Sequence, residues 1–144
     1  MADRLLSCGG SPAATAKTYV GVDETGRIAD SDVRSRVIGH EMDAKAFQLT
    51  IFRMMAESKS NQGPSAATSI LKNAGTKVGT DRAELMIEVM GTQGLGWEGD
   101  DFTGPELIAV HGWLRSKGNS IEGGTSEVNV NVVAKRVLGL PDPK

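Results

Sequence analysis

The stretch "SIEGGTSEVNVNVVAKRVLGLP", residues 120–141, contains a glycine loop, a helix start and a helix stop within one short run. Thr125 or Ser126 can cap a helix with its hydroxyl group. Gly139, followed two residues later by proline, is typical of a helix end, and the two basic residues before it suit a helix C-terminus. The valines of "VNVNVV" also alternate as in a strand. The cap and the stop around them favour a helix over 125–138.

Three further segments upstream have the apolar spacing of amphipathic helices. The first covers residues 30–59, with Asp30 or the serine after it as the cap. The second starts at Pro64, because proline is tolerated in a first turn. The third covers 105–117 behind a Thr103 cap. The sequence therefore predicts an all-α chain that folds as an antiparallel four-helix bundle.

Two details refine this bundle. Residues 30–141 are expected to form it, and residues 1–29 an irregular N-terminal segment with at most a short helix near 13–19. Gly75 and Gly79 lie one turn apart on the second helix. Glycine costs up to about 1 kcal/mol against alanine in a helix, so the pair predicts a close helix–helix crossing.

Bulk properties exclude several classes of protein. The chain has 144 residues, which fits one domain. A net charge of -2 gives no electrostatic reason to bind nucleic acid. No apolar run approaches the roughly 20 residues that span a bilayer, and the start lacks a secretory signal. Cys8 is the one cysteine, so an internal disulfide is excluded and a cytoplasmic location is expected.

Two glycine loops could carry chemistry. In "MGTQGLGWEG", residues 90–99, glycines let backbone N–H groups approach a ligand, although a plain turn explains them equally well. In "SIEGGTSE", residues 120–127, a helix N-terminus can attract electron-rich ligand atoms. Glu122 beside it could abstract a proton if it were buried. The alternative is a capped loop with solvated acids, in which Glu127 only stabilises the helix dipole.

Aromatic residues and metal-binding patterns give little further indication of a functional site. Trp97 falls in the first glycine loop and could contact a planar ligand, whereas Trp113 falls in a helix and is expected to pack in the core. No metal-ligand spacing, phosphate-binding loop or Ser-His-Asp order is present in the sequence.

The run at 120–141 strongly resembles the C-terminal signature of acyl-CoA dehydrogenases, "I-x-G-G-T-S-E-I-Q-R-N-I-I-A-x-R-V-L-G-L-P". The loop "EVMGTQGLG" resembles that family's "Q-x-L-G-G-x-G" segment, at the matching distance upstream. The helices that contain "ADSDVRSRV" and "GPSAATSILK" fit the family pattern too. The resemblance covers about residues 28–141.

The resemblance implies a C-terminal helical bundle that binds FAD together with two other domains. It implies oxidation of an acyl-CoA thioester between its α and β carbons. In the family a carboxylate removes the α proton and the flavin accepts a hydride. An electron-transfer flavoprotein then reoxidises the flavin. The bundle also supplies much of the subunit contact, so a homo- or hetero-oligomer is expected.

Site residues carry over position by position. Thr125 and Glu127 match positions beside the flavin, in a loop that also contains Gly123, Gly124 and Ser126. Gly91 and Thr92 match a loop that meets the adenosine end of FAD, commonly from a neighbouring subunit. The chain departs from the pattern here, with Glu88 in place of a common glutamine and Thr92 in place of a common glycine.

The catalytic base is displaced. Many members have it two residues before the threonine, where this chain has Gly123. Glu122 lies one residue earlier, where tyrosine is common, and a one-residue offset in an extended loop reverses the side-chain direction. Other members with glycine at this position take the base from an upstream helix. Asn129 and Val130 replace the usual Gln-Arg pair of the last helix.

Nothing in the sequence corresponds to the family's N-terminal helical and middle β-domains. We therefore expect a C-terminal piece or subunit that is inactive until another chain completes it. The alternative is a non-catalytic module that docks on a related dehydrogenase, and a further one is a stand-alone bundle without a flavin role. A bundle built to pack on other domains should expose apolar surface.

Overall fold

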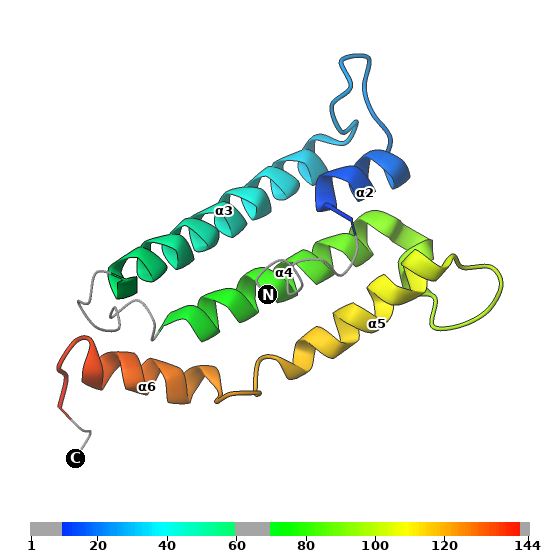
Figure 1. Ribbon diagram of the computed structural model, residues 1–144. Coiled ribbons are helices and arrows are strands. Elements are labelled where there is room, and N and C mark those ends of the chain that lie inside the picture. The colour runs from blue at the N-terminus through cyan, green and yellow to red at the C-terminus, as the bar shows by residue number, and fades with distance from the viewer. Residues whose placement is uncertain (1–9, 60–69, 142–144) are drawn as a thin grey trace.

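The computed structural model describes residues 10–59 and 70–141, and every regular element in these ranges is helical (Figure 1). Cys8 and Pro64 lie outside them. The all-α prediction is confirmed, and one isolated antiparallel bridge joins Val22 to Ile28. The elements are α2 (Pro12–Tyr19), α3 (Ser31–Lys59), α4 (Leu71–Met90), the 3₁₀ segment η2 (Gly91–Leu95), α5 (Gly104–Gly118) and α6 (Ser126–Arg136).

The helix starts are capped by the residue types that the sequence indicated. Oδ1 of Asp30 accepts hydrogen bonds from the backbone N–H groups of Asp32 and Val33, at 2.8 and 2.9 Å, and so caps α3. Thr103 caps α5 in a capping box with Glu106. The side chain of Thr125 caps α6. In each case one cap supplies an acceptor for N–H groups that a helix start leaves unpaired.

Helix α4 is the centre of the fold and packs against α2, α3 and α5 (Figure 1). It runs antiparallel to both α3 and α5. Helix α6 has no buried residue and makes few contacts with α4. The fourth member of the packed group is therefore the short helix α2, and α6, which we expected in that place, lies at the edge.

The core lies where α2, α3 and α4 meet. Ala16, Ile28, Val37, Leu85 and Val89 form one buried cluster. Two of these residues belong to the first 29 residues, which we expected to be irregular with at most a short helix near 13–19, and α2 occupies that place. Burial of Ala16 ties α2 to the bundle, because its side chain is fully excluded from solvent.

One of the two glycines expected at a helix crossing lies there. A Cβ atom on Gly75 would lie 2.8 Å from Cζ of Phe47, so α3 approaches α4 closely at this point. A Cβ atom on Gly79 would meet nothing within 4 Å, and the prediction is wrong for this residue. Near the end of α3, Met54 is buried, whereas Met55 is 52% exposed.

Candidate functional site

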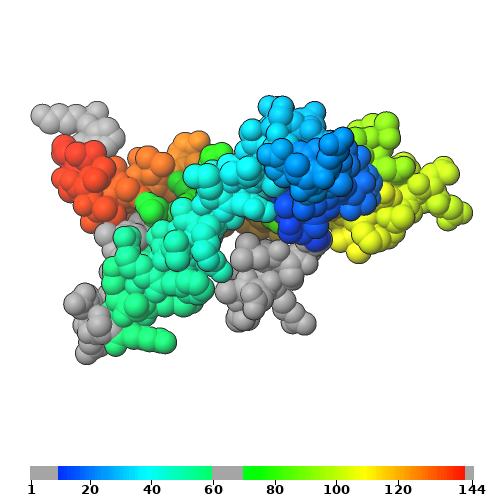
Figure 2. Space-filling model, turned by 90° about the horizontal axis from the view of Figure 1, so that it is seen from above, coloured from blue at the N-terminus to red at the C-terminus, as the bar shows by residue number. Residues whose placement is uncertain are grey.

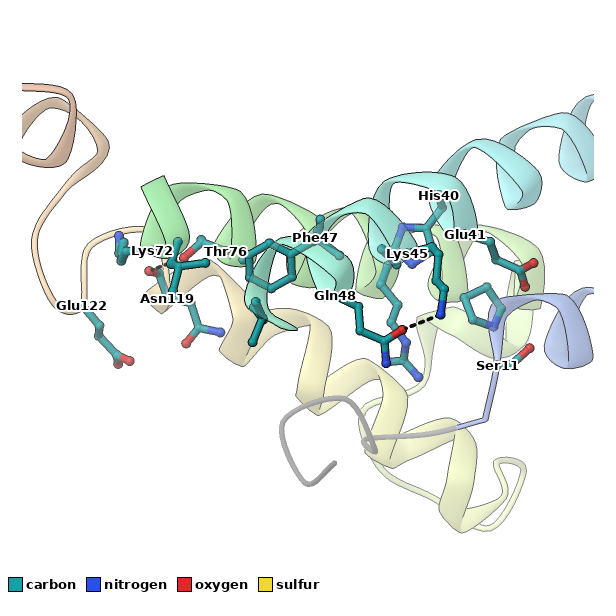
Figure 3. A pocket seen from close by; sticks show the side chains of 17 residues that line it. Ser11, His40, Glu41, Lys45, Phe47, Gln48, Lys72, Thr76, Asn119 and Glu122 are labelled. Atoms are coloured by element: carbon teal, nitrogen blue, oxygen red, sulfur yellow. Dashed lines mark hydrogen bonds between the residues drawn. The ribbon is translucent and has the colours of Figure 1, made fainter. Parts of the chain in front are cut away.

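A groove of about 830 Å³ runs between α3 and α4 (Figure 3). Its middle is apolar and includes Phe47 and Ile51 of α3. His40 lines the end nearer α2, and burial, followed by the charge of Arg82, lowers its pKa. Glu122 lines the opposite end. The groove therefore joins the candidate base to an apolar channel.

The loop that contains Glu122 is held by the first turns of α4. Nζ of Lys72 donates a 2.9 Å hydrogen bond to the carbonyl of Ser120, and the side-chain amide of Asn73 donates to the carbonyl of Ser126 at 3.4 Å. These two bonds fix both ends of the loop. They place the start of α6 beside the N-terminal end of α4.

Glu122 is ion-paired with Arg115. Nη2 of Arg115 lies 2.7 Å from Oε1 and 3.0 Å from Oε2 of the carboxylate, and the Glu122 side chain is 56% exposed. The carboxylate therefore points toward the guanidinium group of Arg115. At the position where many relatives carry the base, Gly123 offers no side chain.

Two glycines make the turn that leads from the loop into α6. Gly123 has φ of 68° and Gly124 has φ of 100°, a region that side-chain-bearing residues rarely adopt. The side-chain amide of Asn129 then donates to the carbonyls of Gly124 and Thr125, at 3.0 and 2.9 Å. Asn129 was noted in the sequence only as a departure from the family pattern. The structure shows that it closes the loop onto its own helix.

The start of α6 carries a negative charge. Hydrogen bonds from the backbone N–H of Glu127 and from the Thr125 side chain lower the pKa of Glu127, with Lys72 adding a smaller effect. Glu127 is therefore ionised near neutral pH, and its carboxylate already accepts hydrogen bonds from donors at the start of α6. A second anion such as a phosphate is disfavoured there, and an uncharged polar ring edge suits the position better.

The second group of predicted residues lies at the other end of α4. Glu88 forms an ion pair with Arg36 of α3. Gly91 has φ of 57° and ends α4, and Thr92 is exposed. The buried Oε1 of Gln93 has no hydrogen-bond partner among the described residues. A ligand would reach this acceptor only after the Gln93 side chain turned outward, because the atom is shielded from solvent.

Two glycines of this segment have a packing role. A Cβ atom on Gly94 would lie 2.5 Å from the carbonyl oxygen of Ile87, and one on Gly96 would lie 2.5 Å from the ring of Phe102. Glycine is therefore required by the close packing of η2. The plain-turn interpretation accounts for both positions.

The two groups of predicted residues do not meet within one chain. One adjoins the first turns of α4 and the other follows its last turn. Helix α4 has 20 residues, which at 1.5 Å per residue separates its ends by about 30 Å. One ligand cannot contact both groups closely unless the second group comes from another copy.

The tryptophans differ in exposure. Trp97 is 57% exposed, its ring centroid lies 4.1 Å from that of His111, and its carbonyl lies 3.1 Å from Nε2 of that histidine. Trp113 is partly buried with Nζ of Lys117 5.2 Å from its ring centroid. Trp97 therefore remains available to a planar ligand, although His111 already occupies one side.

Other kinds of site are missing from residues 10–59 and 70–141. These ranges contain no group of three or more His, Cys, Asp or Glu side chains that could hold a metal ion. None of their helices is long and apolar enough to cross a bilayer.

Comparisons with known proteins identify the family and the fold of this chain. The family model described as "Acyl-CoA dehydrogenase, C-terminal domain" matches residues 13–138. No curated protein sequence matches the chain. Among solved structures, the ChsE4–ChsE5 complex from Mycobacterium tuberculosis matches with a TM-score of 0.73 and 22% identity. That match covers 97% of this chain and 36% of the other, so this chain spans about a third of its length.

Proposed function

The chain belongs to the acyl-CoA dehydrogenase family through its C-terminal domain, and we propose that it is a component of an FAD-dependent acyl-CoA dehydrogenase. In this role it supplies one wall of the flavin site. Other domains, from another chain or another part of the same protein, supply the rest. The completed enzyme would oxidise an acyl-CoA thioester between its α and β carbons, and an electron-transfer flavoprotein would take up the electrons.

One observation carries the proposal, namely that the helical framework is incomplete by itself. Helix α6 buries no residue and an apolar groove stays open between α3 and α4. An isolated helix of 11 residues is marginal in water, so α6 needs further contacts to be stable. Contacts of this kind are available when additional domains or chains pack on this side.

The residues at the start of α6 fit the edge of a flavin ring. Gly123 and Gly124 leave the loop without side chains on the approach, since a Cβ atom on Gly123 would meet nothing within 4 Å. The hydroxyl groups of Thr125 and Ser126 can donate or accept. Bound there, FAD would supply the hydride acceptor, while this loop would hold and orient its ring.

The other group fits the adenosine end of FAD. Gly91 and Thr92 are exposed there, and Oε1 of the neighbouring Gln93 would accept from an amino or hydroxyl group once its side chain turned outward. Because this group lies at the far end of α4, it would serve the flavin of a neighbouring copy. The proposed enzyme is therefore an oligomer in which each chain contributes to two flavin sites.

Glu122 is the chain's own candidate for the base. It lies at the end of the groove, where an acyl chain could reach it. Its ion pair with Arg115 would orient the carboxylate. In the completed enzyme, Glu122→Gln should abolish flavin reduction by an acyl-CoA if Glu122 is the base. If reduction persists, the base comes from the completing domains.

A second function is favoured by that same ion pair and by Gly123. A chain whose base position is glycine, and whose nearest carboxylate is neutralised by an arginine, suits a non-catalytic module that docks on a related dehydrogenase. Such a module would raise the stability of its partner without contributing to the chemistry. The Glu122→Gln variant would leave its effect unchanged.

Flavin binding tests the proposal directly. An acyl-CoA dehydrogenase truncated after its middle domain supplies the other domains, and FAD fluorescence anisotropy should rise saturably, beyond the level with that truncated enzyme alone, as the purified chain is added. Thr125→Val should weaken this binding by about tenfold or more, because the loop loses a hydroxyl group of the site. Thr103→Val is the matched control, since it removes the cap of α5 by the same substitution far from the loop. No saturable rise, or equal effects of the two variants, would contradict the flavin role.

A further inference from the structure

The groove between α3 and α4 is bounded by α2 at the end that lies away from Glu122. Ser11 and Pro12, at the start of α2, line this end together with His40 of α3. Helix α2 packs on both α3 and α4. Figure 2 shows α2 (blue) against the N-terminal half of α3 (cyan), whereas the C-terminal half (green) extends away from it. A chain-like ligand that enters beside Glu122 therefore meets the α2 end with its far end.

Cationic side chains from two helices gather at the α2 end of the groove. Nζ of Lys45 donates a 3.0 Å hydrogen bond to Oε1 of Gln48, and both side chains line the groove (Figure 3). Arg82 of α4 lines it too, and its Nη2 donates a 3.0 Å hydrogen bond to the carbonyl of Gly10. Lys45 and Arg82 therefore bring positive charge from α3 and from α4 to the end that contains His40.

Acidic side chains balance this charge only in part. Glu41 lines the same end, and its side chain is exposed. Burial, followed by the charge of Arg82, lowers the pKa of His40, so its ring is uncharged near neutral pH. Asp43 and Asp81 act on that ring more weakly and in the opposite direction, and neither lines the groove. Among the described residues that line this end, two cations therefore stand against one acid.

The stretch between the two ends of the groove is apolar. Phe47 and Ile51 line it from α3, and Val78 lines it from α4. Positions 72 and 82 of α4, which lie at the two ends, are separated by about 15 Å at 1.5 Å per residue. A polar group in this stretch would lose water without gaining a partner. The groove therefore suits a ligand with an apolar body of this length and a polar group at each end.

From these observations we propose that the groove binds the acyl chain of a CoA thioester whose far end carries a carboxylate, and that Lys45 recognises this carboxylate. Ligand sites are commonly apolar, with a few polar groups that fix the orientation of the ligand. The ammonium group of Lys45 has donors beyond the one that Gln48 accepts. The thioester would lie at the opposite end, beside Glu122, and for this placement the inference rests on the proposed function.

Isothermal titration calorimetry on the full chain, without flavin, tests the inference. The two ligands are the mono-CoA thioester of dodecanedioic acid and the CoA thioester of dodecanoic acid, which differ only at the far end of the chain. The dodecanedioic thioester should bind about tenfold or more tightly, because its carboxylate gains a charge-assisted hydrogen bond. In Lys45→Met the two thioesters should bind with nearly equal affinity.

Lys59→Met is the matched control for this variant. It removes a cation by the same substitution from the last residue of α3, which does not line the groove. The control should keep the preference of the native chain for the dodecanedioic thioester. Far-UV circular dichroism checks that both variants keep their helices.

Three results would overturn the inference. The native chain could bind neither thioester, or it could bind both equally. Lys45→Met could also weaken both thioesters alike, which would show that Lys45 contacts the CoA part that they share. None of these measurements needs flavin. Flavin binding without the preference would contradict this inference alone, whereas the preference without flavin binding would contradict the proposed function.

Discussion

The hydroxyl group of Tyr19 donates a 2.6 Å hydrogen bond to Oε1 of Glu106, across 87 positions of the chain. The other carboxylate oxygen of Glu106 accepts a 2.6 Å bond from the backbone N–H of Thr103. One carboxylate therefore joins α2 to α5 and caps α5 at the same time. The Tyr19 bond, followed by the Thr103 bond, lowers the pKa of Glu106 below its ordinary 4.5.

Tyr19→Phe should lower the melting temperature at neutral pH by a few degrees, because it removes the link while keeping the ring. The lowered pKa of Glu106 stabilises the fold above pH 4.5 and this contribution is lost as the pH falls through the folded-state pKa. The difference in melting temperature between the native chain and Tyr19→Phe should therefore shrink in acid. Melting curves between pH 7 and pH 3, a range of about four units around this pKa, measure it. A constant difference would show that Glu106 is not the acceptor that matters.

Gly75 and Gly79 provide a matched pair for the packing of α3 on α4. Gly79→Ala should raise the free energy of unfolding by about 0.5–1 kcal/mol, because alanine favours a helix and the site is open. The free energy of unfolding of Gly75→Ala should be lower than that of Gly79→Ala by about 1 kcal/mol or more, because the new methyl group displaces the ring of Phe47. Urea unfolding of the two variants gives both values.

The Gly75 result has its own control. Phe47→Leu shortens the side chain that meets the new methyl group. In that background Gly75→Ala and Gly79→Ala should differ much less. Equal stabilities of the two alanine variants in the native background would mean that α3 does not approach α4 at Gly75.

Asn129 should matter for the flavin loop although it need not touch the cofactor. Asn129→Ala removes both hydrogen bonds to the carbonyls of Gly124 and Thr125. Affinity for FAD should then fall several-fold, because the loop must be ordered at the moment of binding. Asn131→Ala, two residues further along α6, is the control and should bind as the native chain does. Equal affinities of all three proteins would show that the loop needs no such bond.

The sequence predicted the helices well because their ends carry local signals. Asp30, Thr103 and Thr125 cap the helices that they were expected to start, and a cap acts on N–H groups within three residues. The path of the last helix was beyond such signals. Whether α6 packs in the bundle depends on contacts with residues far away in the sequence. The apolar residues of α6 do not indicate whether this chain or another chain buries them.

The candidate site shows the same division. The glycines at 123 and 124 predicted a turn into a helix, and their positive φ angles confirm it. The ion pair of Glu122 with Arg115 could not be predicted, because it joins α5 to a loop whose course is set by α4. The groove and the distance between the two groups of site residues depend likewise on how the helices assemble.

The most direct test of the proposed function is reconstitution in trans. An acyl-CoA dehydrogenase truncated after its middle domain is mixed with this chain and FAD, and the flavin absorption is followed on addition of an acyl-CoA. We expect that this chain alone leaves the flavin oxidised and that the mixture retains flavin and bleaches. Bleaching by this chain alone would show that it is a complete enzyme, and a mixture without retained flavin would contradict its role as part of the flavin site.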